Sequence, residues 1–280
     1  MPAGRSSVPP AVAAFHALHE SGCFVLPNPW DVGTAVCLAR LGFRALATTS
    51  AGFAFARGKP DEVRSLPRDE VLDHVREIVG ATSLPVNADF QNGYADEPDG
   101  VAANVALCVR TGVAGLSIED ASGDGAQPLY ALDLAVRRVR AARAAIDASG
   151  VPVVLTARCE AWLVGERAPA RTALERLVAF AEAGADCLYA PGVREPAAIA
   201  ALVRAVAPKP LNVLVSGPHL TLRELADLGV RRVSLGSALA RVAWGAFLRA
   251  AHGLAESGSF EALSGAASFA ELNTLFGARG

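Results

Sequence analysis

The strongest constraint on the fold is a regular alternation of short β-rich segments with helical segments along most of the 280 residues. Eight β-rich segments are bounded by Gly, Pro or polar residues. They are CFVLPN from 23, ALATTS at 45–50, PVNADF at 85–90, GLSIED at 115–120, PVVLTAR at 152–158, CLYAPG at 187–192, LNVLV at 211–215 and RVSLGS at 232–237. They lack a regular apolar–polar alternation, as is typical of parallel strands covered on both faces.

Between these segments, apolar residues recur every three or four positions, which is the period of a helix with one buried face. The helical segments expected from this period span residues 31–42, 68–80, 99–112, 132–150, 171–184, 195–207 and 221–229. Many end at a glycine that can form a left-handed cap, namely Gly42, Gly80, Gly112, Gly150, Gly184 and Gly229. The hydrophobic tail after Ser237 predicts the eighth helix and further helices, with a capping box at Ser268–Glu271.

This order of segments predicts an α/β fold, a parallel (β/α)8 TIM barrel. We expect a single domain over residues 1–280, with the barrel at about 20–250 and C-terminal helices at about 251–280. A doubly wound open sheet is the structural alternative. Such a sheet usually carries a glycine-rich phosphate turn after its first strand if it binds a dinucleotide, and the chain has neither a G-x-G-x-x-G nor a Walker sequence.

Composition and charge exclude several classes of function. The formal net charge is −2, and no basic run is interleaved with aromatic residues, so nucleic-acid binding is not expected. No apolar stretch is long enough to span a membrane or to act as a signal-peptide core, which predicts a soluble, cytoplasmic protein. The five cysteines are widely spaced and odd in number, which argues against a disulfide framework and a zinc cluster.

In a parallel barrel, catalytic residues lie at the C-terminal ends of the strands, so reactive side chains at these ends are candidates for the site. They are Asn28, Asp31, Thr48, Thr49, Ser50, Asn87, Asp89, Glu119, Asp120, Arg158, Glu160, Ser216 and His219. For Asn28, Asp31 and Asp120, a helix cap or a turn is the favoured interpretation, because Asp and Asn often follow strands in that role.

Asp89 and Glu119 predict a metal site. Both end consecutive strands and would face each other across the barrel mouth, where repulsion raises a pKa unless a cation neutralises them. Mg²⁺, which is often held by one or two carboxylates with water and substrate oxygens, suits such a pair. Arg158 would project into the same mouth and bind a carboxylate or phosphonate through two hydrogen bonds. The alternative for Arg158 is a structural ion pair with Glu160 or Glu119.

The segment TTSAG offers small residues whose backbone N–H groups can bind a carboxylate or stabilise an enolate. The segment 53–67, FAFARGKPDEVRSLP, predicts a loop long enough to act as a lid. Asp61 within this loop is the candidate mobile acid or base, although a solvated loop residue is an equal alternative. Asn212, in the seventh β-rich segment, is a further candidate for substrate binding.

Taken in this order, these segments resemble the isocitrate lyase/phosphoenolpyruvate mutase superfamily over roughly residues 10–255. LPNPWDVGTA resembles its opening strand and turn, ATTSAG its substrate-binding loop, and VNADFQNGY its Asp-x-Asp-x-Gly-Tyr metal segment. SIED resembles the strand with its metal-linked glutamate, and TARCEAW resembles the segment whose arginine binds substrate.

The resemblance implies an Mg²⁺-dependent enzyme, with Mn²⁺ as an alternative ion, that cleaves or forms a C–C or P–C bond in a 2-oxo or 2-hydroxy acid through an enolate-like intermediate. It implies these roles: Thr49, Ser50 and Ala51 bind substrate; Asp89 and Glu119 hold the metal; Arg158 binds the anionic end; and Asp61 lies on the gating loop. We therefore take Asp61, Glu119 and Arg158 as the catalytic candidates. Family members typically form tetramers that exchange the eighth helix, which implies a homo-oligomer, a dimer or a tetramer.

Two departures from the superfamily pattern narrow the reaction. Asn87 replaces the first aspartate of the metal motif, so it offers a neutral ligand, and two residues are added before Gly93. The Lys-Lys-Cys-Gly-His loop is replaced by IEDASGDGAQPLYALD, and Cys159, which would point away from the mouth, is a poor substitute. Isocitrate or methylisocitrate cleavage by the usual mechanism is therefore not expected.

The leading hypothesis is a lyase, decarboxylase or hydrolase of a small 2-oxo or 2-hydroxy dicarboxylate. The alternatives are P–C chemistry, as in phosphoenolpyruvate mutase or phosphonopyruvate hydrolase, and a non-catalytic binder of 2-oxo acids. An aldolase with a Schiff-base lysine is disfavoured, because Lys59 and Lys209 lie outside the β-rich segments.

Overall fold

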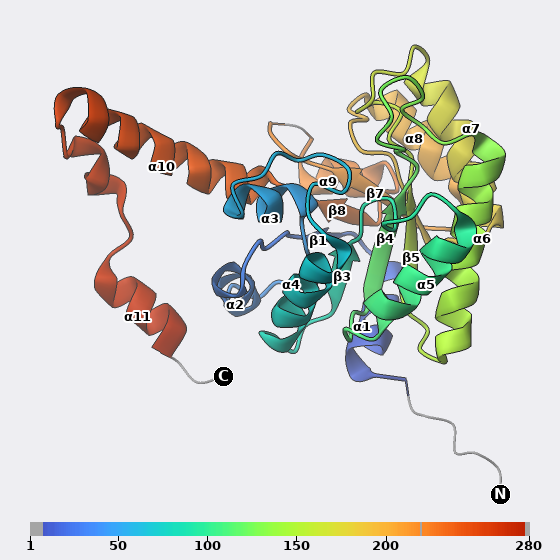
Figure 1. Ribbon diagram of the computed structural model, residues 1–280, viewed down its shortest axis with the longest axis horizontal. Coiled ribbons are helices and arrows are strands. Elements are labelled where there is room, and N and C mark those ends of the chain that lie inside the picture. Colours follow the sequence, from blue (N-terminus) through green and yellow to red (C-terminus); the bar gives the residue numbers. More distant parts are fainter. Residues whose placement is uncertain (1–7, 219, 278–280) are drawn as a thin grey trace, which may run out of the picture.

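The computed structural model describes residues 8–218 and 220–277. Eight parallel strands form one sheet in the order β1-β8-β7-β6-β5-β4-β3-β2 (Figure 1). Their bounds are β1 Phe24–Leu26, β2 Leu46–Ala47, β3 Val86–Asp89, β4 Gly115–Glu119, β5 Val154–Arg158, β6 Cys187–Tyr189, β7 Leu211–Leu214 and β8 Arg232–Ser234. The Ala47 N–H donates to the Pro27 carbonyl at 3.0 Å, which joins the two remaining edges and nearly closes the barrel.

Helices follow the strands around the barrel, so the predicted (β/α)8 barrel is confirmed. The bounds are α1 Pro10–Glu20, α2 Val32–Arg40, α3 Ser50–Ala56, α4 Arg68–Gly80, α5 Pro98–Val109, α6 Leu132–Ser149, α7 Pro169–Glu182, α8 Pro196–Val206, α9 Leu222–Asp227, α10 Ala238–Ser257 and α11 Phe269–Gly277, with a 3₁₀ helix at Glu261–Gly265. Five of the six predicted glycine caps have positive φ. Gly80 was predicted wrongly, because it is the last residue of α4 and the cap is Ala81 in the right-handed region.

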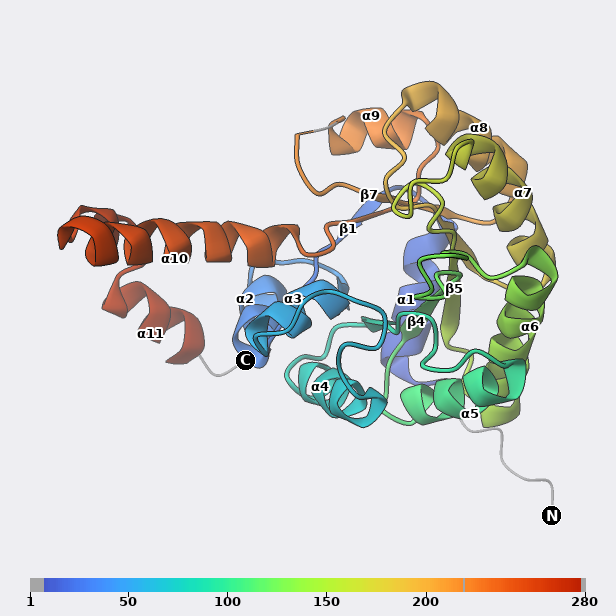
Figure 2. The same cartoon turned by 45° about the horizontal axis from the view of Figure 1, so that its top comes forward.

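The N-terminal end of the barrel is closed by α1. Phe15 of this helix is fully buried and packs edge-on against Phe24 at the start of β1, with ring centroids 6.4 Å apart. A Cβ atom at Gly115 would lie 2.5 Å from the Phe15 ring, so only glycine at the start of β4 leaves room for it. Figure 2 shows α1 crossing the centre of the arc of barrel helices. The barrel is therefore open to solvent mainly at its C-terminal end.

Helix α3 corrects the prediction that residues 53–67 form one loop. Thr49 is the N-cap of this helix, and its hydroxyl accepts a hydrogen bond from the Gly52 N–H at 3.2 Å. The helix continues to Ala56, so the loop over the mouth is limited to residues 57–67. Periodicity could not reveal α3, because its seven residues are too few to establish a helical repeat.

Helix α10 projects away from the barrel in both views (Figures 1 and 2), and α11 folds back so that Phe276 lies near Gly33 of α2. The Glu271 N–H donates to the Ser268 hydroxyl at 3.1 Å, which supplies one half of the predicted capping box before α11. Large apolar side chains are exposed along this extension, namely Val242, Trp244, Phe247, Leu248, Leu254, Phe260, Leu263, Phe269, Leu272 and Phe276. Many large exposed apolar side chains on one extension are typical of an interaction site. Among the described residues, no helix is both long and apolar enough to cross a bilayer.

We predict that this surface joins copies of the chain. Light scattering coupled to size exclusion should give a mass that is a multiple of 28.8 kDa for the wild type. The double variant Phe247→Glu/Phe269→Glu should give a smaller mass, because two charges would enter the apolar surface. Leu41→Glu is the control, since Leu41 is 67% exposed on the barrel itself. A wild-type mass of one chain would contradict the prediction.

Candidate active site

The C-terminal end of the barrel opens into a cavity of about 160 Å³ that descends between the strands. Eight of the nine site residues predicted from the sequence line it, namely Thr49, Ser50, Ala51, Asp61, Asn87, Asp89, Arg158 and Asn212. Glu119 does not. It lines a smaller cavity behind Arg158, which Arg158 also touches.

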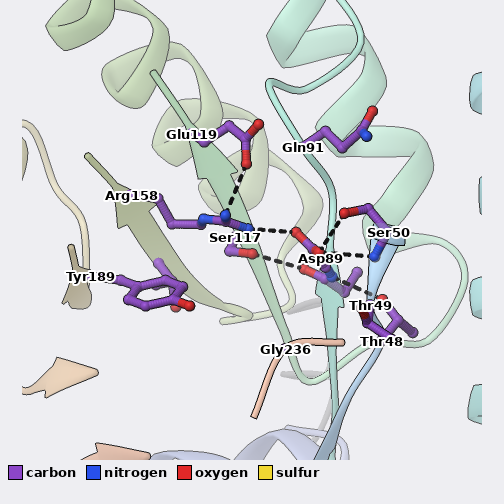
Figure 3. A network of polar contacts seen from close by, with 12 residues as sticks. Thr48, Thr49, Ser50, Asp89, Gln91, Ser117, Glu119, Arg158, Tyr189 and Gly236 are labelled. Carbon is purple, nitrogen blue, oxygen red and sulfur yellow. Dashed lines mark hydrogen bonds and ion pairs between the residues drawn. The ribbon is translucent and has the colours of Figure 1, made fainter. Parts of the chain in front are cut away.

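Arg158 lies at the centre of a cluster of three carboxylates, with Asp89 and Glu119 on either side of it (Figure 3). Its Nη1 is 2.7 Å from Asp89 Oδ1, its Nη2 is 3.2 Å from Glu119 Oε2, and its Nε is 2.9 Å from Glu160 Oε1. Strand register sets this geometry, because Arg158 pairs with Glu119 on β4 and with Tyr189 on β6. The guanidinium carbon lies 5.1 Å from the Tyr189 ring centre. The ion-pair alternative for Arg158 is thus present alongside its position in the cavity.

With all three carboxylates ionised, the cluster would carry a surplus of two negative charges, because one guanidinium faces three carboxylates. Burial raises the pKa of Glu119 well above its ordinary value, and the charges of Glu160 and Asp89 add to this rise while Arg158 opposes it. Burial also raises the pKa of Glu160. Burial would lower the pKa of Arg158, but the three carboxylates raise it, so Arg158 stays charged. The cluster can therefore accept a cation or protons.

The residues of the cluster fit Mg²⁺, because a hard divalent ion takes carboxylate oxygens and would offset the surplus charge. Within the described ranges, no three His, Cys, Asp or Glu side chains converge on one point as metal ligands. Asp89 and Glu119 would therefore hold the ion together with water and substrate oxygens, as Mg²⁺ sites commonly do.

Asn87 lies deeper in the cavity than Asp89 on the same face of β3. Its Nδ2 donates to the Ala88 carbonyl at 3.1 Å, while its Oδ1 is buried without a hydrogen-bond partner among the described residues. This oxygen lies beside Gly115 at the start of β4. It is therefore separated along the strand from Glu119, which ends β4. The amide oxygen thus faces the barrel interior.

Asp89 pairs with Arg158 and also holds the start of α3. Its Oδ2 accepts hydrogen bonds from both the N–H and the hydroxyl of Ser50, each at 2.9 Å. The N–H of Asp89 donates to the Thr48 hydroxyl at 2.9 Å. The N–H and hydroxyl of Ser50 already donate to Asp89. The next N–H, that of Ala51, has no intrahelical acceptor because it lies in the first turn. It is therefore the group of this segment best placed to bind an anion.

The loop 57–67 covers the mouth and places Asp61 at the cavity. Loss of hydration and then the negative charge of Asp89 raise the pKa of Asp61, and Arg158 opposes the rise. Gln91 holds the loop: its Oε1 accepts from the Arg64 N–H at 3.0 Å, and its Nε2 donates to the Glu62 carbonyl at 3.3 Å. Gln91 lies in the extended VNADFQNGY segment and was not predicted as a site residue.

We predict that Gln91→Ala loosens this loop. Trypsin should cleave after Arg57 or Arg64 several times faster in the variant, because both side-chain hydrogen bonds to the loop backbone are lost. Gln127→Ala is the matched control, since Gln127 is exposed in another loop. Equal cleavage rates in wild type and Gln91→Ala would show that Gln91 does not hold the loop.

The sequence from residue 15 to residue 255 matches the family described as phosphoenolpyruvate phosphomutase. The chain belongs to the isocitrate lyase/phosphoenolpyruvate mutase superfamily. The uncharacterized protein Rv1998c of Mycobacterium tuberculosis (strain H37Rv) is 35% identical over 225 residues, which are 80% of this chain and 82% of that protein. The oxaloacetate decarboxylase of Chromohalobacter salexigens is 32% identical over 232 residues, which are 79% and 77% of the two chains.

Solved structures of the superfamily share the fold. A crystal structure from Burkholderia cenocepacia J2315, named only as a lyase/mutase, is 48% identical, has a TM-score of 0.91 and covers 96% of both chains. The structure of oxaloacetate acetylhydrolase with the product oxalate is 27% identical, has a TM-score of 0.83 and covers 95% of this chain and 93% of the other.

This superfamily member replaces the Lys-Lys-Cys-Gly-His loop with a segment that stays away from the cavity. A bridge between Ala121 and Leu129 closes the segment, and the Ser122 hydroxyl donates to the Gln127 carbonyl. None of residues 120–131 lines the cavity. Cys159 is fully buried in the core, and burial raises its thiol pKa. Neither residues 120–131 nor Cys159 therefore supplies a titratable side chain to the cavity.

Three of the strand-end residues form hydrogen bonds or ion pairs that hold neighbouring segments in place. Asp31 caps α2 as predicted, accepting from the Thr34 N–H at 2.7 Å. Asp120 is not a cap: its carboxylate accepts from the Glu160 N–H at 2.8 Å and pairs with Arg176 at 2.9 Å, because it is buried between β4 and β5. Asn28 ties β1 to the end of β8 through the N–H groups of residues 235 and 236.

The two candidates after β7 contribute little to the described site. The Ser216 carbonyl accepts from Arg241, and its side chain is not part of the cavity lining. His219 lies outside the described residues. Tyr189, by contrast, was missed: it lies inside the predicted segment 187–192, and only the structure shows that β6 ends at this residue.

Proposed function

We propose that the protein is an Mg²⁺-dependent enzyme that cleaves a C–C bond in a small 2-oxo dicarboxylate, with decarboxylation of oxaloacetate as the first candidate reaction. The observation that carries the proposal is the cluster of Arg158 with Asp89, Glu119 and Glu160 at the barrel mouth. Such a surplus of carboxylates suits a divalent ion, and the similarity to oxaloacetate decarboxylase supports the choice of substrate.

In this reaction the C3–C4 bond of oxaloacetate breaks, the C4 carboxylate leaves as CO₂, and its bonding electrons remain as the enolate of pyruvate. Mg²⁺ at Asp89 and Glu119 would supply Lewis-acid stabilisation of the charge on the 2-oxygen, an effect of several kcal/mol. The Ala51 N–H and Arg158 orient the anionic end of the substrate that lies at the mouth. The loop held by Gln91 excludes water.

A proton must then reach C3 of the enolate, and Asp61 is the candidate donor. Burial and the charge of Asp89 raise the pKa of Asp61, so this carboxyl group stays protonated to higher pH than usual, which favours it as the proton donor. The rate should fall as pH rises through the raised pKa of Asp61.

Asp61→Asn should lower kcat by about 100-fold and remove this limb of the pH profile, whereas Glu62→Gln should keep it. An unchanged profile in Asp61→Asn would exclude Asp61 as the donor.

A screen of 2-oxo acids tests the proposed function. Oxaloacetate should be turned over in the presence of Mg²⁺, with pyruvate measured by a coupled assay, and EDTA should abolish turnover. Turnover that is unaffected by EDTA would refute the proposal. Binding of 2-oxo acids in calorimetry without turnover of any of them would favour the non-catalytic binder instead.

P–C bond chemistry is the second candidate, because the matching family is described as phosphoenolpyruvate phosphomutase. Arg158 at the mouth could hold a phosphonate as well as a carboxylate. Phosphorus NMR separates the two candidates: phosphonopyruvate converted to phosphoenolpyruvate or phosphate would support P–C chemistry, and an unchanged spectrum would exclude it.

A further inference from the structure

The floor of the cavity contains a buried arginine whose charge no carboxylate offsets. Arg232 is the first residue of β8, is 2% exposed and lines the cavity. Its guanidinium donates to Asn212 Oδ1 at 2.8 Å and to Thr156 Oγ1 at 2.9 Å, and its Nη1 is 3.3 Å from His19 Nε2. All three partners are neutral acceptors. No salt bridge joins Arg232 to any carboxylate within residues 8–218 and 220–277.

His19 cannot become a second positive charge beside Arg232. Its Nδ1 must carry the proton, because it lies 2.7 Å from the Phe15 carbonyl, which only accepts. Its Nε2 then accepts from Arg232, which only donates. Burial, and next the charge of Arg232, lower the pKa of His19 to about 3, so the imidazole stays neutral at physiological pH.

The guanidinium has capacity for a further ligand. Arginine has five N–H donors, and the three contacts of Arg232 use one each. A buried charge is costly unless it is paired and hydrogen-bonded. The Oδ1 of Asn87, which lines the same cavity, is buried without a hydrogen-bond partner in the described chain, and it can bind only a donor such as water. The spare donors of Arg232 indicate an anionic ligand between the strands.

The two ends of the cavity differ in charge. At the mouth, Arg158 is shared among three carboxylates, so its attraction for an anionic ligand is reduced. At the floor, Arg232 faces only neutral groups, including Asn212, which in turn donates to the Ser234 hydroxyl at 2.9 Å. An anion that enters the cavity is therefore drawn toward the floor.

We propose that Arg232 makes the floor of the cavity an anion-binding position, so that the cavity takes a small acid with an anionic group at each end. The proposal rests on the proposed function for the nature of the substrate, a dicarboxylate. A carboxylate paired with Arg232 gives up that pairing if it leaves as CO₂. The group at the floor is therefore the carboxylate that stays in the product, and the bond that breaks lies nearer the mouth.

Calorimetry with malonate and propionate tests this position, because the two acids are similar in size and differ in their second carboxylate. In the presence of Mg²⁺, the wild type should bind malonate at least tenfold more tightly than propionate. Arg232→Gln should reduce this preference to about twofold or less. Arg231→Gln is the matched control, since it removes the same charge from the neighbouring residue, whose Nη1 donates to the Gly22 carbonyl. A folded Arg232→Gln protein with the wild-type preference would overturn the proposal.

Arg232→Lys provides a second test if the Gln variant does not fold, because it keeps the charge and removes the planar fork. It should keep a preference for malonate and bind malonate several times more weakly than the wild type. Unchanged malonate affinity in this variant would overturn the proposal. The binding assay needs no turnover. Arg232-dependent binding by a protein that cleaves no 2-oxo acid would therefore leave this position standing and remove only the proposed activity.

Discussion

Replacing Arg158 by Met should destabilise the protein by about 3–5 kcal/mol, because it leaves buried carboxylates without their common partner. Burial raises the pKa values of Glu119 and Glu160 in the folded protein, so their protonation favours folding as pH falls. The loss of stability should therefore be largest at about pH 8 and shrink toward about pH 5. Chemical denaturation at several pH values measures this dependence.

Arg158→Lys separates catalysis from folding at the same position. Lysine keeps the positive charge, but its ammonium group lacks the planar donor fork with which Arg158 contacts three carboxylates. We expect a loss in kcat/KM for oxaloacetate of about 100-fold, or roughly 3 kcal/mol of transition-state stabilisation, with a smaller loss of stability than in Arg158→Met. Wild-type activity in Arg158→Lys would show that Arg158 has only a structural role.

Asp89→Asn should lower turnover of oxaloacetate by about 1,000-fold or more, a loss of roughly 4 kcal/mol. The change is isosteric, so the amide oxygen can still accept from Ser50 and hold the start of α3. What it removes is the charge that pairs with Arg158 and that would ligate Mg²⁺. Steady-state kinetics with saturating Mg²⁺ measures the effect.

Asp133→Asn is the matched control for Asp89→Asn, because Asp133 is exposed on α6 and pairs only with Arg137 there, at 3.5 Å. Its turnover should equal that of the wild type. Thermal unfolding of both variants checks the fold. If the Asp89→Asn variant kept more than a tenth of the wild-type rate, the metal-binding or catalytic groups would have to lie elsewhere.

The barrel could be predicted from the sequence because each β-rich segment is short, apolar and bounded by turn residues. Strand ends then placed Asp89, Glu119 and Arg158 together, since parallel strands of a barrel end at the same face. The sequence offered an ion pair of Arg158 with Glu119 or Glu160 as an alternative. It did not reveal that Arg158 also contacts Asp89, which lies on β3, a strand that does not pair with β5.

Other parts of the site depend on contacts between distant residues. Helix α3 begins where Ser50 meets Asp89, 39 positions along the chain, and no local pattern encodes that contact. Gln91 holds the loop through backbone groups of residues 62 and 64. The side chains of the loop therefore give no sign of this contact in the sequence. Arg232 follows another arginine at the start of a strand, and only the closed barrel shows that it points inward.

We propose that the carboxylate cluster around Arg158 makes the barrel mouth a site for metal-dependent C–C cleavage. Protein stripped with EDTA and titrated with Mg²⁺ in oxaloacetate tests it most directly, with Asp89→Asn at the same Mg²⁺ concentrations to subtract decarboxylation by the free ion. Pyruvate formation should rise with Mg²⁺ to saturation in the wild type and stay at the background rate in the variant. Equal rates in the two proteins, or full activity in EDTA, would contradict it.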